Sequence, residues 1–266
     1  MKLLDAAVRQ LFEHYTLPLP AAHRITAPSA AYSAAQALQG TVLLRAQVPD
    51  AFNSRYQVRC DSPAAAQHTA EQLLGSQINR HTVQALWVEA IPQAQPLLDL
   101  SIALDRPSQR PMLRAKQLHR PTPREVNLPM DPLLGFQAYH QVQVASEMLM
   151  PRALWDAFFA LLSNSFRLFT EQDALEVNLA PLARLSQAGE APPLVVLSAS
   201  VVVDDNALFR HADLLRDETP EQHQRRRLRF VPLEGQIGCL VNGAGLALAT
   251  PGLAHPTGPN PGHSPG

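Results

Sequence analysis

Apolar side chains recur at helical spacing at the start of the chain. Leu4, Val8 and Leu11 stand four and three positions apart before Pro18 ends the pattern. Residues spaced in this way lie on one face of an α-helix. Further helices are predicted at 30–38, 63–74, 137–149, 151–169 and 214–227. The third and fifth of these six helices begin with proline, which is favoured at the first helical position.

Runs of apolar and β-branched residues predict strands between these helices. The run at 41–48 follows Gly40, which ends the preceding helix. Runs 175–178 and 194–203 are expected to pair around a turn at Gly189. Strands are also predicted at 85–88, 97–104, 229–233 and 237–241. Strands and helices alternate without repeats, so the sequence predicts an α/β or α+β protein with mixed sheets.

Two segments carry too much proline for regular structure to be expected. Residues 106–132 contain six prolines and should be mostly extended or looped. Between Thr250 and Gly266, nine of 17 residues are proline or glycine. Such a composition cannot offset the entropy of ordering by burial, so 251–266 is expected to be a disordered tail.

Composition and charge narrow the class of protein. Hydrophobic residues make up 46% of the chain and charged residues 17%, as in ordinary globular proteins. The net charge of −1 provides no field that would attract nucleic acid or an anionic membrane. Asp5 and Arg9 interrupt the apolar run that a secretory leader would need. With only two cysteines, the expected location is the cytoplasm.

Two segments, VVVDDNALFRHADLLRD at 201–217 and IGCLVNGAGLALAT at 237–250, are informative about ancestry. Supporting segments lie in the same order further upstream: LWVEA at 86–90, LDRPSQRPML at 104–113, DPLLGFQAYHQVQVA at 131–145 and EQDALEVN at 171–178. Together they resemble the β subunit of succinyl-CoA synthetase, also called succinate–CoA ligase. The resemblance runs from the first helix to Thr250.

That resemblance implies an ATP-grasp fold, in which two mixed α+β lobes clamp a nucleotide. The ATP-grasp part would span 1–235, with a smaller lobe inserted at about 20–104. Residues 236–250 would be the start of the flavodoxin-like CoA-ligase domain that follows in the family, and a truncation or frameshift could explain its short length. The resemblance also implies ATP and Mg²⁺ as cofactors and an α-like CoA-ligase subunit as partner, together forming acid–CoA thioesters.

By the same resemblance, Arg45 and Glu89 are the candidate nucleotide-binding residues. Arg45 stands where the family has a lysine, and its planar guanidinium differs in shape from an ammonium. An ordinary surface or salt-bridging arginine is the alternative for Arg45, and a solvated strand-end glutamate is the alternative for Glu89. The loop that should close on the phosphates, at 49–56, has no glycine and contains Asp50. A phosphate-binding loop needs glycine for positive φ and close backbone approach.

Asn178 and Ser198 are the candidate Mg²⁺ ligands. Ser198 replaces the family's aspartate with a neutral hydroxyl, whereas Mg²⁺ usually binds through at least one carboxylate. Glu176 lies two residues before Asn178 and therefore on the same face of that strand. For Asn178 the alternative is a buried, hydrogen-bonded asparagine. Asn242 corresponds to a family residue that contacts substrate.

Two functions are consistent with these residues. The first is an ATP-grasp enzyme subunit whose family reaction is ATP-dependent acid–CoA ligation, weakened or lost by the changes at the phosphate and metal positions. The second is a non-catalytic relative that keeps the fold and serves as an interaction or scaffold protein. Titration with Mg-ATP distinguishes them.

Overall fold

A computed structural model describes residues 1–47, 57–78, 81–118, 122–131, 134–186 and 194–215. The chain divides into two units, Met1–Leu214 and Leu215–Gly266. Several predictions lie outside the described residues: the loop 49–56, the turn at Gly189, all but the first residues of the helix 214–227, the strands 229–233 and 237–241, Asn242, the domain start at 236–250 and the tail 251–266.

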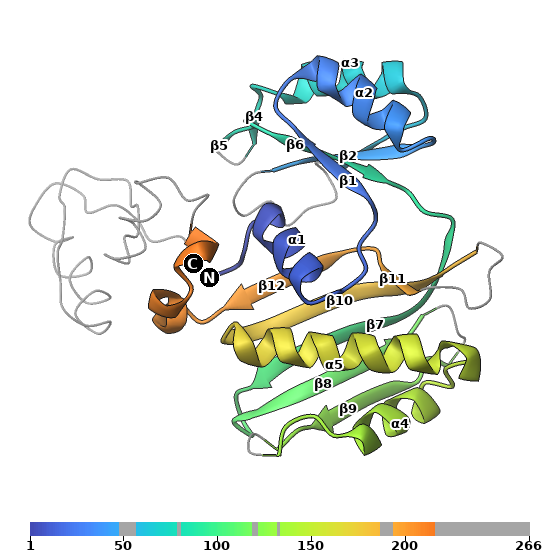
Figure 1. Ribbon diagram of the computed structural model, residues 1–266, viewed down its shortest axis with the longest axis vertical. Helices are drawn as coiled ribbons and strands as arrows, with labels where there is room; N and C mark the ends of the chain where they lie inside the picture. The colour runs from blue at the N-terminus through green and yellow to red at the C-terminus, as the bar shows by residue number, and fades with distance from the viewer. Residues whose placement is uncertain (48–56, 79–80, 119–121, 132–133, 187–193, 216–266) are drawn as a thin grey trace, which may run out of the picture. The chain divides into compact units, whose positions relative to one another are not determined.

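The smaller sheet has four antiparallel strands in the order β1-β6-β2-β3. Their bounds are β1 (Ala22–Ile25), β2 (Val42–Ala46), β3 (Gln57–Cys60) and β6 (Leu86–Ala90). Helices α2 (Pro28–Ala37) and α3 (Pro63–Leu73) cover one face of this sheet (Figure 1). Alanines on these helices permit close packing against Val42, Leu44 and Val88, which are fully buried. A short ladder of β4 (Gln77–Ile78) and β5 (His81–Thr82) follows α3.

Alternation along these strands sends other side chains to the opposite face. On β2, Arg45 lies between the buried Leu44 and Ala46, and on β6 its directly paired neighbour is Trp87. Glu89 is two residues beyond Trp87 and therefore on the same face. The face of the smaller sheet that is not covered by α2 and α3 thus carries Arg45, Glu89 and the indole of Trp87. Arg24 and Arg59 share this face, because they pair directly with Trp87 and Leu43.

The larger sheet is built around one long strand, β10 (Ala174–Leu185). The strand order is β11-β10-β7-β8-β9, and β12 also pairs with β10. The other members are β7 (Ala94–Asp105), β8 (Arg110–Gln117), β9 (Glu125–Pro129), β11 (Leu194–Val196) and β12 (Ala199–Val203). Helices α4 (Ala138–Glu147) and α5 (Trp155–Glu171) lie on one face of this sheet, α5 following the 3₁₀ turn η2 (Arg152–Leu154) (Figure 1). Phe158 and Leu162 of α5 are fully buried there, as is Val177 of β10.

Helix α1 (Asp5–His14) is the first helix of the chain, and its buried residues are Ala7, Val8, Leu11 and Phe12. The residues before it join the larger sheet through a bridge between Lys2 and Val202 of β12. After α1 the chain passes through Pro18, whose carbonyl accepts a hydrogen bond from Val196, and enters the smaller sheet at β1. The described chain ends in two 3₁₀ turns, η3 (Asp205–Arg210) and η4 (Ala212–Leu215).

The predicted class is confirmed, and the strand pairing decides between its two forms. Every strand pair among the described residues is antiparallel, so the fold is α+β rather than α/β. The mixed sheets that the alternation suggested are not seen there, because β7, β8 and β9 follow one another directly without a helical crossover. The predicted pairing of 175–178 with 194–203 is confirmed by the β10–β12 ladder. The helices predicted within the described residues are also confirmed, with bounds shifted by a few residues.

The proline-rich segment is more regular than predicted. It contains β8 and β9, and Leu113 and Val126 on these strands are buried. Pro111 lies near the start of β8, and its carbonyl accepts a hydrogen bond from Met130. Pro129 ends the edge strand β9, where no further strand needs its missing amide.

The elements of the smaller sheet lie between residues 22 and 90, within the range 20–104 expected for the smaller lobe. Strand β7, most of which also falls in that range, pairs in the larger sheet. The domain boundaries themselves stay predictions. In the described part of the chain, no helix has the length and apolar character needed to cross a membrane.

Candidate functional site

Helix α1 positions Asp5 and Arg9 one turn apart beside its buried stripe. Their side chains are partly buried, with 29% of Asp5 and 16% of Arg9 exposed. Arg9 donates to the carbonyl of Pro20 over 3.0 Å, and its guanidinium lies 4.9 Å from the ring centre of Trp87. The helix therefore presents one anion and one cation to the uncovered face of the smaller sheet.

Glu89 is the centre of a group of four charges. Only 6% of this residue is exposed, and Arg9 Nη2 donates to its Oε1 over 2.6 Å. Arg45 donates from Nη2 to the same oxygen. On its other side, Arg45 Nε lies 3.5 Å from Asp5 Oδ2. Two arginines and two carboxylates thus form one connected cluster without net charge.

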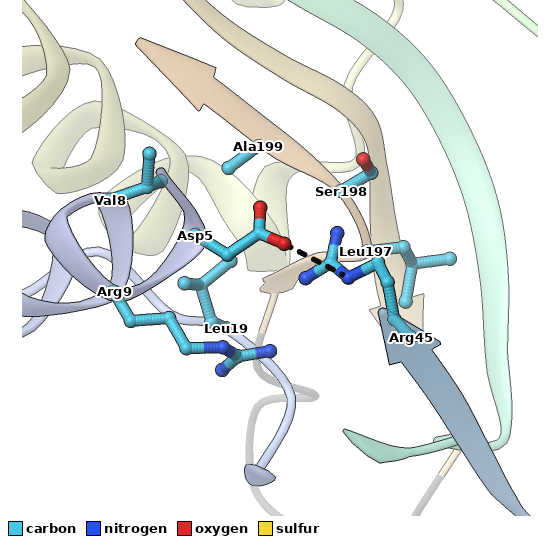
Figure 2. A pocket seen from close by; sticks show the side chains of 8 residues that line it. All are labelled: Asp5, Val8, Arg9, Leu19, Arg45, Leu197, Ser198 and Ala199. Atoms are coloured by element: carbon cyan, nitrogen blue, oxygen red, sulfur yellow. Dashed lines mark ion pairs between the residues drawn. The ribbon is translucent and has the colours of Figure 1, made fainter. Parts of the chain in front are cut away.

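A small hollow lies beside this cluster. Its empty volume of about 250 Å³ includes open solvent, and the lining atoms leave room for only about one water molecule. Figure 2 shows the side chains of Asp5 and Arg45 pointing toward one another, with Ser198 above them at the bend between β11 and β12. The lining residues are Asp5, Val8, Arg9, Leu19, Arg45, Leu197, Ser198 and Ala199. Two of the sequence candidates, Arg45 and Ser198, therefore come together here from different sheets.

Burial raises the pKa of the Asp5 carboxyl above its ordinary value. Arg45 opposes this effect, Glu89 adds to it, and Arg9 and Lys2 oppose it more weakly. Removal of water disfavours the charged form of a carboxyl, which is why desolvation outweighs the neighbouring cations.

A pH-dependent stability difference is expected for Asp5→Asn. Because the folded-state pKa of Asp5 is raised, its stabilising contribution is present below the unfolded-state pKa of about 3.9 and is lost as the pH rises through the folded value. Asp5→Asn should therefore gain stability relative to the parent chain as the pH rises toward 7. Urea unfolding at a series of pH values measures this difference.

The control for this experiment is Asp156→Asn. Asp156 occupies the first turn of α5 as Asp5 occupies that of α1, but it is exposed to solvent. It should not reproduce the pH-dependent difference. An advantage of Asp5→Asn that shrinks as the pH rises would show that the ionised carboxylate stabilises the fold.

Several buried donors at this cluster have no hydrogen-bond acceptor. Within the described residues, this applies to Arg9 Nε, Arg45 Nε and Trp87 Nε1. Trp87 is only 8% exposed. Arg45 Nε nevertheless faces Asp5 Oδ2 at 3.5 Å, so this ion pair is made without a hydrogen bond.

The metal candidates lie on the larger sheet. Asn178 of β10 is directly opposite Ser101 of β7 and Ser200 of β12, so these side chains share one face. Ser198 is two residues from Ser200, and its carbonyl accepts a hydrogen bond from Ala180. Asn178 is partly buried and does not line the hollow.

Asn178 and Ser198 by themselves do not make up a Mg²⁺ site. Amide and hydroxyl oxygens are neutral, so Asn178 and Ser198 supply no charged ligand. The carboxylates on the same face are those of Glu176, two residues before Asn178, and Asp99, two residues before Ser101. In the part of the chain that the structure describes, no cluster of three or more histidine, cysteine or acidic side chains could hold a metal ion. Mg²⁺ normally requires carboxylate ligands or the phosphates of a bound nucleotide.

The structure shows the surroundings of the two nucleotide candidates, Glu89 and Arg45. Glu89 is a buried, doubly ion-paired residue, so the alternative of a solvated glutamate is wrong. Arg45 forms salt bridges, as its alternative describes, and its contact with nucleotide stays a prediction. Asp5 and Arg9 were not candidates. Their spacing of four residues at the edge of an apolar helical stripe is the signal that could have indicated a role.

Comparison with known proteins gives the ancestry of this arrangement. A family model described as the ATP-grasp domain matches residues 2–184. The ADP-forming succinate–CoA ligase β subunit of Syntrophotalea carbinolica is 31% identical over 281 residues, covering 94% of this chain and 70% of the relative. The chain belongs to the succinate–CoA ligase β-subunit family of ATP-grasp proteins. The β subunit of Thioalkalivibrio sulfidiphilus is 30% identical over 276 residues, again covering 94% of this chain and 70% of the relative.

Solved structures agree with this family at the level of the fold. An ATP citrate lyase from Methanosaeta concilii, in complex with (3S)-citryl-CoA, has a TM-score of 0.63 at 9% identity. The match covers 95% of this chain and 67% of that one. A dinucleotide-forming acetyl-coenzyme A synthetase from Ca. Korarchaeum cryptofilum has a TM-score of 0.56 at 12% identity, covering 76% and 93% respectively. The succinate–CoA ligase β-subunit family thus shares its ATP-grasp fold with other proteins of CoA chemistry.

Proposed function

We propose that this chain is a β-subunit-like ATP-grasp protein with a weakened nucleotide site. Its family reaction is ATP-dependent acid–CoA thioester formation with an α-like subunit. Arg45 would contact the nucleotide phosphates, Glu89 would border the base, and Asn178 and Ser198 would face the metal that accompanies the phosphates. Asn242 would contact substrate, as the family resemblance implies.

The observation that supports weakened nucleotide binding is that Arg45 already forms ion pairs. Its guanidinium already interacts with Glu89 and Asp5, so the cluster has no net positive charge to attract phosphates. The metal position adds no carboxylate at Ser198. Removing one charged hydrogen bond to the nucleotide costs about 1.5–3 kcal/mol, and ~1.4 kcal/mol changes a dissociation constant tenfold.

A second function is favoured by the same features. A relative that keeps the fold but has lost turnover could serve as an interaction or scaffold protein, with an α-like subunit as the expected partner. Neutralised charge at Arg45 and neutral oxygens at the metal position are compatible with loss of turnover. The two functions differ in whether nucleotide binds at all.

Calorimetric titration with Mg-ATP and Mg-ADP tests the proposal. We expect weak binding, with a dissociation constant on the order of 1 mM. Micromolar affinity would overturn the weakened site. No heat at ~10 mM nucleotide would overturn nucleotide binding and leave the scaffold function. Coexpression with an α-like subunit, followed by an assay of thioester formation, then tests for turnover.

A further inference from the structure

The charge cluster at the smaller sheet has an asymmetric construction. Glu89 is buried and accepts hydrogen bonds from Arg9 and Arg45 at one carboxylate oxygen. Asp5 is more exposed and approaches Arg45 Nε only to 3.5 Å, without a hydrogen bond. Arg45 is therefore held firmly on one side and loosely on the other.

This construction places carboxylates against part of the guanidinium that a phosphate would need. A guanidinium binds an oxyanion through neighbouring N–H groups that lie in one plane. On Arg45, Nη2 is committed to Glu89, and Nε faces the Asp5 carboxylate. An anion entering from the hollow would meet Asp5 and Arg45 together, because both line it. The carboxylate would repel that anion at the point where Arg45 would attract it.

We propose that the carboxylates of Asp5 and Glu89 compete with phosphate for Arg45. By pairing with its guanidinium, they prevent polyphosphate anions from binding there. The proposal rests on the proposed function, in which Arg45 is the phosphate-binding residue. Of the two carboxylates, Asp5 is the one that can move away from Arg45. Its contact with Arg45 is longer, and its side chain is more exposed than that of Glu89. Displacing or neutralising Asp5 opens the site, whereas Glu89 stays in place between Arg9 and Arg45.

The long contact between Asp5 and Arg45 distinguishes this arrangement from a close, hydrogen-bonded salt bridge. In the described residues, Arg45 Nε and Arg9 Nε are buried without an acceptor, although two carboxylates lie in the same cluster. The hollow beside Arg45, which Ser198 also lines, has room for only about one water molecule, so a polyphosphate enters only if the Asp5 side chain moves.

The test compares binding of inorganic triphosphate and Mg-ATP to the parent chain, Asp5→Asn and Asp156→Asn. Asp156→Asn makes the same change of charge in the first turn of an exposed helix end. We expect Asp5→Asn to bind triphosphate about tenfold more tightly than the parent chain, and Asp156→Asn to bind like the parent. Adding Arg45→Met to Asp5→Asn should abolish the gain. Circular dichroism confirms that each variant is folded.

Glu89→Gln provides a second, nearly isosteric variant should Asp5→Asn fail to fold, and it should also bind triphosphate more tightly than the parent. Equal affinity of the parent chain and both variants would overturn the proposal while leaving weak nucleotide binding intact. A gain that persists after Arg45→Met would overturn it as well. If neither the parent chain nor any variant bound triphosphate or Mg-ATP, both the proposal and the nucleotide-binding function would be overturned.

Discussion

Glu89→Ala is expected to lower the free energy of unfolding by about 3–5 kcal/mol, because it leaves two arginines without their shared carboxylate. Glu89 is 6% exposed, and the side chains of Arg9 and Arg45 are 16% and 19% exposed. Their charges would face each other in a partly desolvated space. Urea unfolding followed by circular dichroism measures the decrease.

Glu125→Ala is the matched control for Glu89→Ala. Glu125 is also a strand glutamate, but it is exposed at the start of the edge strand β9. Its removal should change stability by no more than about 0.5 kcal/mol. Adding Arg9→Met to Glu89→Ala should restore part of the stability, since it removes one uncompensated charge. A decrease below about 1 kcal/mol for Glu89→Ala would contradict an essential role for the shared carboxylate.

Phe12→Ala is expected to cost about 3–5 kcal/mol through the cavity that it leaves under α1. Phe12 is fully buried, and α1 carries Asp5 and Arg9 on its adjoining surface. The substitution should therefore also loosen the hydrogen bonds of Arg9 with Glu89 and Pro20. Thermal and urea unfolding give the decrease in stability. In a Trp155→Phe background, which removes the second tryptophan, fluorescence of Trp87, over whose ring Arg9 lies, reports on the cluster.

Phe209→Ala makes the same change at a residue that is 82% exposed. It should leave stability within about 0.5 kcal/mol of the parent chain. If the two phenylalanine variants were destabilised by similar amounts, α1 would not be packed as described. If a strongly destabilised Phe12→Ala variant kept the Trp87 fluorescence of the parent chain, the charge cluster would not depend on the packing of α1.

Local patterns in the sequence were sufficient to predict most elements of the fold. Ser62 caps α3 by accepting a hydrogen bond from Ala65, and Pro63 takes the first helical position, as the sequence predicts. Strand β2 forms within the run 41–48 that predicts it, and its residues alternate between buried and partly exposed. The strands of the proline-rich segment were missed, because a proline excludes a strand only where its missing amide would have paired.

The candidate site was predictable only in part, because its contacts join residues that are distant in the chain. Family resemblance indicated Arg45 and Glu89 separately, but their ion pair spans 44 positions, and that of Arg9 with Glu89 spans 80. No local spacing reveals such pairs. In the sequence, Asp5 and Arg9 only argued against a secretory leader, because they interrupt an apolar run. The fold brings both of them into the charge cluster with Arg45 and Glu89.

The path of the chain into and out of the smaller sheet has an evolutionary consequence. Ala90 donates to the carbonyl of Ala21 over 2.8 Å, so the polypeptide leaves and returns at neighbouring points. All described strands of the larger sheet lie outside 22–90. Recombination between relatives at these two junctions would exchange a complete four-stranded layer with its helices. Arg45 and Glu89 would travel together in such an exchange, while Asp5, Arg9, Asn178 and Ser198 would stay behind.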